Sequence, residues 1–363
     1  MDTSTALVVG STGIAGTALT ERLVASGWHV LGLSRSERER AGVTPVRVDL
    51  RDGAALDAAL RRAPARLVFF TAWIKGQDEA ENILANGGFV RDVLRSLNES
   101  PVEHAALVTG LKHYLGPFEA YGTGEVRDTP FHEDEPRLAT PNFYYAQEDE
   151  LVAAASAQGF TWSVHRAHTM VGFVQGNAMN MALTLGIAAA LCTYAERPLY
   201  FPGSAAQWNG LSDVTDVELL AEHLIWAATH DEAANLPFNV VNGDVFRWRW
   251  LWPRIAEALG VRTEPFDGTV RTLTDQMAKV EHLWPELVTT HGLSAGNLHR
   301  LASWWHTDSD LGRPMECLTD MANSRSRGFL AARPTLDSFS RAFARYRQAN
   351  ILPGNPNAFG YMT

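Results

Sequence analysis

Three glycines near the start of the chain have the spacing of a phosphate-binding turn. Gly10, Gly13 and Gly16 follow a Val-rich stretch and open a helical pattern, written G-x-x-G-x-x-G. Glycine permits a tight turn in which backbone N–H groups approach a pyrophosphate, and the helix N-terminus favours its negative charge. Such turns also occur without a ligand. Here a strand precedes the turn and a helix follows it, and this combination predicts a dinucleotide-binding unit.

The residues that would meet the adenosine ribose indicate which dinucleotide is bound. Ser34 and Arg35 end the second strand, where an acidic residue typically binds the 2′-hydroxyl of NAD. Arg35 instead offers planar donors for the 2′-phosphate of NADP, and Arg38 and Arg40 follow it. Two glutamates separate these arginines, which could simply solvate a strand end, so use of NAD stays open. We predict NADP(H), with Asp49 beside the adenine.

The chain contains a pair of tyrosines in the region where a reductase would carry its acid. Such enzymes need a group that protonates or hydrogen-bonds the substrate oxygen as hydride arrives. A tyrosine usually supplies it, with a lysine one helical turn later. Tyr144 and Tyr145 are followed at that distance by Glu148 and Asp149, so a carboxylate stands in each place where the ammonium is expected. Taken alone, this pattern would indicate an inactive site.

Two longer motifs change that interpretation. They are TGLKHYLGPFE at 109–119 and NFYY at 142–145, the latter followed by ED at 148–149. In both, the sequence resembles the progesterone 5β-reductase and iridoid synthase-like family of atypical short-chain reductases. The likeness continues through WSVHR at 162–166, FNVVNGDVF at 238–246 and GFL at 328–330, so it covers nearly the whole chain.

The resemblance implies that the lysine has moved to Lys112 and that the catalytic tyrosine is Tyr144. In the family, the tyrosine hydroxyl stabilises the enolate oxygen after hydride reaches the β-carbon of an activated alkene, and the lysine orients it and the nicotinamide ribose. Physical chemistry agrees, because a nearby ammonium makes a phenol with a pKa near 10 a better donor to a developing oxyanion. The alternatives are a solvated lysine and aromatic residues that pack a helix.

The resemblance also implies an apolar substrate pocket. Phe118 and Phe339 resemble positions that line it, although Phe339 could equally be a core aromatic. Met179 and Asn180 head an inserted helix and could form a lid, but a Met-rich stripe is more often simple packing. Ala167 stands where many relatives have proline, which leaves the stereochemistry open.

Further cofactor contacts are expected at the carboxyl ends of the strands, where ligands of such sheets bind. The histidines are expected to be satisfied structural groups, and no group of His, Cys or carboxylates has the spacing of a metal site. The complete predicted cofactor set is Gly10, Thr12, Gly13, Ile14, Gly16, Ser34, Arg35, Asp49, Leu50, Thr71, Ala72, Trp73, Thr109, Gly110 and Met170.

The elements that would position these residues alternate between short apolar runs and longer helical patterns. This alternation predicts an α/β fold, a Rossmann-type doubly wound parallel sheet with helices on both faces. The expected strands are 6–9, 28–34, 46–50, 67–72, 105–110, 161–166 and 238–241.

The second half of the chain reads differently. An Ala- and Met-rich helix follows Gly172, and the region from Phe246 onward is mostly helical and rich in tryptophan. We therefore expect a Rossmann domain of residues 1–175 with about 212–245. A smaller, mainly helical substrate-binding cap would contain about 176–211 and 246–363.

Composition excludes several classes of partner. With 41 acidic and 31 basic side chains the net charge is −10, so binding to nucleic acid or to an anionic membrane is not expected. No signal peptide precedes the first strand, and the Ala-rich stretch 178–195 suits a buried helix better than a spanning one. Two distant cysteines fit a reducing cytoplasm. Homodimer formation is left open.

Together these observations predict an NADPH-dependent 1,4-reductase of a small apolar enone. The same tyrosine could serve 1,2-reduction of a ketone or aldehyde if the carbonyl carbon lay over the nicotinamide. A non-catalytic NADP(H)-sensing protein is the alternative of another class, since a fold does not fix a function. The natural substrate and the direction of the reaction are left undecided.

Overall fold

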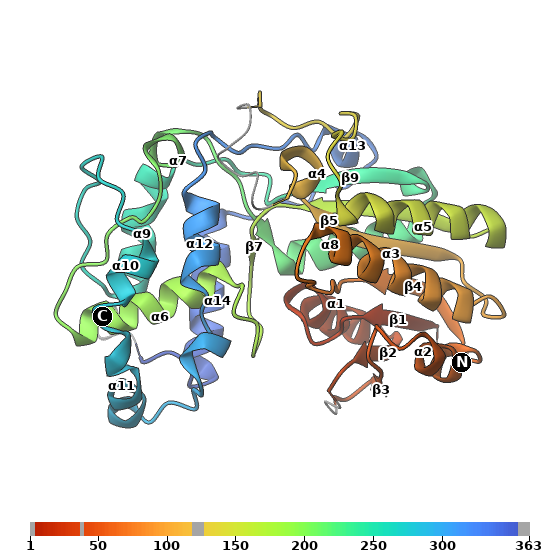
Figure 1. The fold of residues 1–363 in the computed structure, drawn as a ribbon, viewed down its shortest axis with the longest axis horizontal. Coiled ribbons are helices and arrows are strands. Elements are labelled where there is room, and N and C mark those ends of the chain that lie inside the picture. Colours follow the sequence, from red (N-terminus) through yellow and green to blue (C-terminus); the bar gives the residue numbers. More distant parts are fainter. Residues whose placement is uncertain (1–3, 37–39, 118–126, 355–363) are drawn as a thin grey trace.

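The computed structural model describes residues 4–36, 40–117 and 127–354. The chain forms two halves that lie side by side, a sheet with helices on both faces and a wholly helical cap (Figure 1). Within the described residues no helix is both long and apolar enough to cross a membrane.

The larger half is built on one seven-stranded parallel sheet with the order β3-β2-β1-β4-β5-β6-β9. The strand order reverses between β1 and β4, which is where an open sheet of this kind binds its ligand. This confirms the predicted Rossmann-type fold. The strands are β1 (Thr5–Val9), β2 (His29–Ser34), β3 (Val43–Arg47), β4 (Ala65–Phe70), β5 (His104–Gly110), β6 (Thr161–Ala167) and β9 (Leu236–Val240).

The third strand differs from the sequence prediction of 46–50. It begins at Val43, which pairs with Val30, and it contains Pro45. Proline cannot donate to a ladder, but β3 is the edge of the sheet and needs donors on one side only. Asp49 therefore lies beyond the strand end, still at the carboxyl edge of the sheet.

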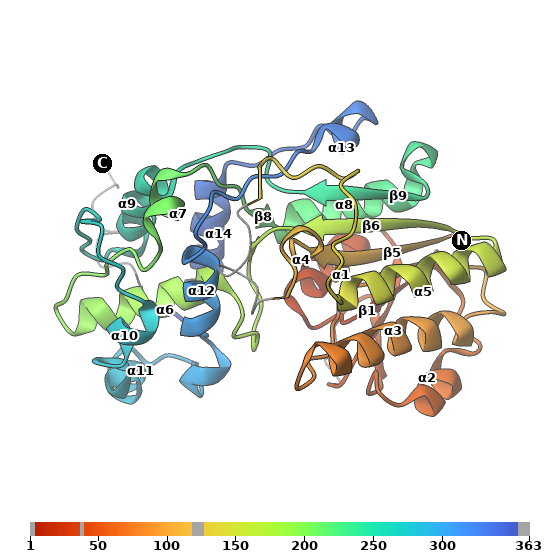
Figure 2. The same ribbon diagram turned by 45° about the horizontal axis from the view of Figure 1, so that its top comes forward.

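Helices cover both faces of the sheet because successive side chains of each strand point to opposite sides. Ala6 and Val8 of β1 pack with α1 (Ile14–Ala25) and α8 (Val217–Thr229). Leu7 and Val9 pack on the other face. That face is covered by α2 (Gly53–Leu60), α3 (Glu79–Ser96) and α5 (Phe143–Gln158), as Figure 2 shows.

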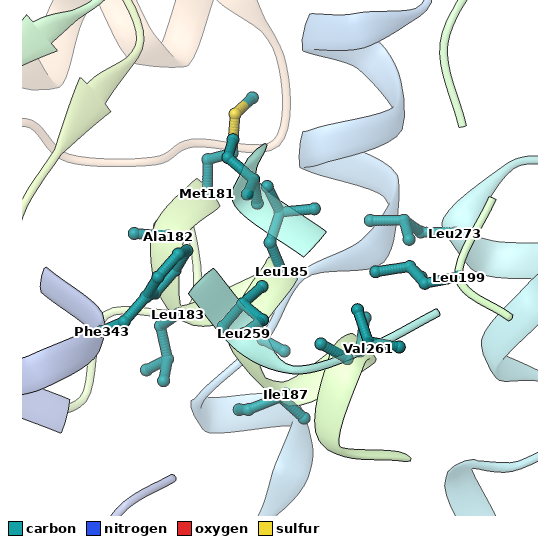
Figure 3. Packing of buried hydrophobic residues seen from close by; sticks show 14 of the residues in the cluster. Met181, Ala182, Leu183, Leu185, Ile187, Leu199, Leu259, Val261, Leu273 and Phe343 are labelled. Carbon is teal, nitrogen blue, oxygen red and sulfur yellow. The ribbon is translucent and has the colours of Figure 1, made fainter. Parts of the chain in front are cut away.

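The cap has a core of its own, built around α6 (Met181–Tyr194). This helix is apolar on nearly every side and most of it is buried, as expected for a helix that other helices surround. Figure 3 shows side chains of α6 packed against Leu199, Leu259 and Phe343. The other cap helices are α7 (Ala205–Asn209), α9 (Trp248–Leu259), α10 (Leu273–Met277), α11 (Trp284–His291), α12 (Trp304–Leu311) and α14 (Thr335–Gln348).

Short elements connect the two halves. Strand β7 (Met170–Val171) pairs in parallel with β8 (Thr215–Asp216) where the chain leaves and re-enters the sheet half. The remaining elements are the helices α4 (Lys112–Leu115) and α13 (Ala322–Ser326) and the 3-10 turns η2 (Asp231–Ala233), η3 (Glu281–Leu283) and η4 (Leu298–Arg300).

One late segment returns from the cap to the sheet. Met321 and Phe329, on either side of α13, are buried in the same core as α1, α8 and β9. The predicted division assigned everything after residue 246 to the cap, whereas this segment belongs by its packing to the Rossmann half. Its apolar residues are too few to show a period in the sequence.

Candidate active site

The glycine-rich turn packs tightly between β1, α1 and β4. Gly10 has φ +91°, and a Cβ added to it would lie 2.7 Å from Ala72 Cβ. A Cβ on Gly16 would lie 2.1 Å from the carbonyl oxygen of Gly10. The hydroxyl of Thr71 donates to the carbonyl of Val9 at 2.9 Å and fixes the facing strand. Only glycine fits the first and third positions of the motif.

The helix that follows this turn offers its N-terminus to a ligand. Gly13 is the N-cap of α1, no side chain caps the helix, and its first turn has no acidic residue. The N–H groups that a helix leaves unpaired at this end favour an anion. The cradle therefore fits the pyrophosphate of a dinucleotide.

A small pocket lies beside this turn, at the end of β2. Its polar lining includes Ser11, Thr12, Ser36 and Arg40, as well as Ser34, whose hydroxyl donates to the carbonyl of Ser36 at 2.6 Å. Arg35, which follows Ser34, is exposed. Asp49 is also exposed, and its carboxylate accepts from the Arg51 N–H at 3.0 Å. The pocket has hydroxyl and guanidinium donors where the adenosine ribose is expected.

Lys112 lies at the carboxyl end of β5, in the first position of α4. Its side chain is only 7% exposed. The ammonium lies 4.5 Å from the centre of the Phe143 ring and 3.4 Å from Oε2 of Glu79. Trp73, from the loop after β4, stacks on the Phe143 ring with 5.6 Å between the ring centres. The lysine thus lies over an aromatic ring and is paired with a carboxylate.

Tyr144 lies in the first turn of α5, and one asparagine brings it to Lys112. The Asn142 side chain accepts from the Tyr144 N–H at 3.0 Å and donates to the Lys112 carbonyl at 2.7 Å. Gly110 faces the phenol, since a Cβ there would lie 3.5 Å from the Tyr144 hydroxyl oxygen. The displaced lysine, which follows the end of β5, and the tyrosine, which lies at the start of α5, are therefore brought together.

The hydroxyl of Tyr144 is available to a ligand. The side chain is half-buried, and its oxygen makes no hydrogen bond within the described residues. Burial raises the pKa of Tyr144, and the negative charge of Glu79 raises it further. The phenol is therefore protonated at neutral pH and can donate. The hydroxyl of Thr109, next to Gly110, is buried and likewise has no partner among the described residues.

The second tyrosine has a structural role. The hydroxyl of Tyr145 donates to the His113 carbonyl at 2.6 Å and accepts from the Leu138 N–H at 3.0 Å. The two carboxylates at the usual lysine positions pair with Arg137, Glu148 at 3.0 Å and Asp149 at 2.7 Å. Both carboxylates are thus paired with one guanidinium.

Of the four predicted substrate contacts, the structure describes three, and these differ in how far they are buried. Phe118 lies outside the described residues, and Met179 is half-buried ahead of α6. Asn180 is fully buried, caps α6 by accepting from the Leu183 N–H, and donates to the Tyr346 hydroxyl at 2.8 Å. Phe339 is fully buried in the cap core. In this conformation Asn180 and Phe339 have no free surface, so their contact with substrate stays a prediction that the packing does not favour.

Two contacts at the site were not foreseen from the sequence. Glu79 starts α3 and reaches both Lys112 and the N–H of Phe143, the latter at 2.8 Å. Lys75, from the loop after β4, lies 5.4 Å from the ring centre of Trp305 in α12 and so joins the sheet half to the cap. The acidic pair Asp78 and Glu79, which opens the helix that follows β4, was the available signal for Glu79.

A second polar cluster, the histidine chain, lies where β5, β6 and α8 pack together. His104, His165 and His223 each use both ring nitrogens in hydrogen bonds within the chain. Burial lowers the pKa of His104 to about 4 and of His223 to about 3 and holds that of His165 well below its usual value. The chain runs through Thr161, His104, Ser163, His165, His223 and Ser324, each link being 2.8 or 2.9 Å long.

His168 is also a satisfied group, separate from this chain. Its Nδ1 lies 2.7 Å from an Asp213 carboxylate oxygen and its Nε2 lies 2.9 Å from the Arg313 guanidinium. Nδ1–H therefore donates to Asp213, and Nε2 accepts from Arg313. Within the described part of the chain no three His, Cys, Asp or Glu side chains are grouped to hold a metal ion.

Comparison with known sequences gives full-length matches. The family model described as the PRISE-like Rossmann-fold domain matches residues 62–353. An (S)-8-oxocitronellyl enol synthase of Camptotheca acuminata is 38% identical over 96% of this chain and 93% of its own. A 3-oxo-Δ4,5-steroid 5β-reductase of Arabidopsis thaliana is 36% identical over 96% of this chain and 93% of its own.

Solved structures share the architecture at low sequence identity. A UDP-glucose 4-epimerase of Thermotoga maritima, solved with UDP-glucose, has a TM-score of 0.66 at 13% identity and covers 95% of this chain and 99% of its own. The enzyme WbmH of Bordetella bronchiseptica, solved with NAD+, has a TM-score of 0.65 at 15% identity, with 96% and 99% covered. These similarities support the fold.

Proposed function

The chain belongs to the PRISE-like Rossmann-fold family, and from that premise we propose that it reduces the carbon–carbon double bond of α,β-unsaturated ketones or aldehydes with NADPH. It is an oxidoreductase of the extended short-chain dehydrogenase type. Relatives named as a steroid 5β-reductase and as enol synthases support the choice of an activated alkene as substrate.

The chemistry assigned to the site follows from its donors. When bound, the reduced nicotinamide supplies the hydride to the β-carbon of the substrate. The Tyr144 hydroxyl, which has no partner among the described residues, donates a hydrogen bond to the substrate carbonyl oxygen. Negative charge develops on that oxygen as the carbon–carbon π bond breaks. Lys112 stabilises that charge and holds the phenol in place. Protonation at the α-carbon then gives the saturated carbonyl compound.

Preference for NADP(H) over NAD(H) is supported by the pocket at the end of β2. Arg40, Ser36 and Thr12 line it, Arg35 flanks it, and none of the described residues that line it is acidic. A 2′-phosphate would receive charged and hydroxyl hydrogen bonds there, whereas a ribose diol would find no carboxylate among these described residues to accept from it.

An apolar substrate is supported by the rings around the site. The Trp73 ring stacks on that of Phe143, which lies beside the Lys112 ammonium. Trp305 of the cap contacts Lys75, which lies in the same loop after β4 as Trp73. A cytoplasmic location is supported by Cys192 and Cys317, both of which are free and buried.

One observation carries the proposal: the Asn142 side chain links the Lys112 backbone to the first turn that carries Tyr144. The test is incubation with NADPH and a 3-oxo-Δ4-steroid or 2-cyclohexen-1-one, followed by chromatography and mass spectrometry. We expect the saturated ketone. An allylic alcohol would assign 1,2-reduction instead, and stoichiometric NADPH binding without oxidation across a broad enone and carbonyl panel would contradict an enzymatic role.

A further inference from the structure

We propose that Glu79 is a positioning residue of this reaction, fixing the Lys112 ammonium against the first turn of α5 and placing a negative charge beside Tyr144. The inference rests on the proposed function for its consequence in turnover, and on geometry alone for the placement. Glu79 had no part in the predicted site, and the reaction assigned above does not use it.

The carboxylate joins three elements at one point. One oxygen of Glu79 accepts from the Phe143 N–H at 2.8 Å. The other lies 3.4 Å from the Lys112 ammonium and accepts from the Asn82 amide at 3.1 Å. The side chain is 20% exposed and that of Lys112 only 7%. The contact is therefore shielded far better than an ordinary surface ion pair.

Positive charge gathers around the Glu79 carboxylate. The residue is the first of α3, and its partner Phe143 is the first residue of α5. The positive ends of two helix dipoles and the Lys112 ammonium thus surround one negative charge. Each of these partners lies on a different element, so the carboxylate sets the distance between them.

Glu79 and Asn142 divide the positioning between them. Asn142 caps α5 at Tyr144 and binds the Lys112 carbonyl, so it holds the backbone of both catalytic residues. Glu79 binds the N–H one residue earlier and the charged end of Lys112. The backbone is therefore fixed without Glu79, whereas Glu79 gives the ammonium a charged contact in addition to the Phe143 ring.

The charge of Glu79 also acts on the phenol. The groups placed against Tyr144 are Glu79 from α3, the Phe143 ring at 4.5 Å and the uncharged Gly110 from β5, and Lys112 pairs with Glu79. Burial raises the pKa of Tyr144, and Glu79 raises it further. The carboxylate thereby opposes the tendency of the neighbouring ammonium to ionise the phenol, and Tyr144 stays a hydrogen-bond donor at alkaline pH.

The test compares Glu79→Gln with Glu81→Gln. Glutamine keeps an acceptor for the Phe143 N–H but removes the charge. Glu81 lies in the same helical turn and also accepts a backbone N–H, from Gln77 at 2.8 Å, without contacting Lys112. For Glu79→Gln we expect the alkaline limb of kcat/KM to move down by about one pH unit and kcat to fall about tenfold. Glu81→Gln should match the wild type.

A second measurement separates this inference from the proposed function. Ultraviolet titration of tyrosinate, taken as the difference from Tyr144→Phe in each background, needs no turnover. Glu79→Gln should lower the midpoint of Tyr144, and Glu79→Asp, which keeps the charge, should lower it less. An unchanged titration midpoint and pH profile in Glu79→Gln would contradict the proposal and leave Glu79 only the structural role of accepting the Phe143 N–H. Absence of enone turnover by the wild type would instead contradict the proposed function and leave the titration to decide.

Discussion

The candidate active site and the histidine chain are two buried polar clusters of the same sheet. They differ in how many of their polar atoms already have a hydrogen-bond partner. Every ring nitrogen of His104, His165 and His223 is already hydrogen-bonded. The hydroxyl of Tyr144 has no partner within the described residues. Burial and titratable groups are common to both clusters, so unspent hydrogen-bonding capacity toward a ligand is what marks the functional one.

Replacing Tyr144 by Phe tests this comparison with the largest expected effect. Loss of the donor to the developing oxyanion should lower kcat by about 100-fold to 10,000-fold, with folding and NADPH binding retained. Steady-state kinetics and cofactor titration measure both. Tyr145→Phe is the matched control, because its hydroxyl is spent on His113 and Leu138. It should lose stability and keep its activity per folded molecule; the reverse pattern would exchange the roles of the two tyrosines.

Acid should act partly through the histidine chain. Each folded-state pKa is lowered by burial, to about 4 at His104 and about 3 at His223, whereas the unfolded value is near 6.5. The folded state thus binds fewer protons, and its stability is complete above about pH 6.5 and falls with decreasing pH. Each histidine can remove about 1.4 kcal/mol per pH unit over that window. Urea unfolding at several pH values would reveal the slope, and a flat profile between pH 6.5 and 4.5 would refute this role.

Breaking the chain at its middle link should cost less. His165→Leu leaves the Ser163 hydroxyl and a His223 nitrogen without one of their partners, which should destabilise the fold by about 2 kcal/mol. Chemical denaturation measures the loss at pH 7.5, and the acid dependence described above should become shallower in the same variant. Activity of the folded fraction should be unchanged. A turnover defect with normal stability would place this chain in the mechanism and remove the distinction between the two clusters.

The smallest effect is expected at the pocket beside β2. Arg40→Ala should weaken NADPH by about tenfold, the value of one charged hydrogen bond to the 2′-phosphate, and leave NADH binding nearly unchanged. Fluorescence titration with both cofactors gives the ratio. Arg51→Ala is the control, because Arg51 lies beside Asp49 and contacts the Lys75 carbonyl at 3.2 Å, outside this pocket. Equal losses for NADPH and NADH in Arg40→Ala would contradict a phosphate contact.

The sequence predicted the sheet half in detail because its signals are local. Buried parallel strands read as short apolar runs, and the predicted strand 161–166 is observed as Thr161–Ala167. The predicted bounds of β3 were wrong because Pro45 argues against a strand in the sequence, whereas an edge strand tolerates proline. Helix 178–195 was also correct in kind, as α6, whereas five-residue cap helices such as α10 are too short to show a period.

The candidate site was predictable only in part. Lys112 and Tyr144 were assigned through family motifs, and the structure brings their two elements together through Asn142. Glu79 is 33 residues from Lys112 in the sequence, and no local pattern links them. Asn180 was expected at the substrate, but an asparagine directly before an apolar helix is first of all an N-cap. Long-range pairing is settled by packing, which a pattern of residue types does not contain, whereas the cap at Asn180 was a local signal in the sequence.

The return of Met321 and Phe329 to the sheet has a consequence for how the protein is made. Both residues are buried with α8 and β9, yet the ribosome adds them after α6 through α12 of the cap. Domains usually fold from the N-terminus during synthesis, at about 5–20 residues per second. Here the cofactor half is complete only when residue 329 has left the ribosome, and the cap core is complete later still, because Phe339, Phe343 and Tyr346 of α14 belong to it. Neither half therefore has its whole core until nearly all of the chain has been made.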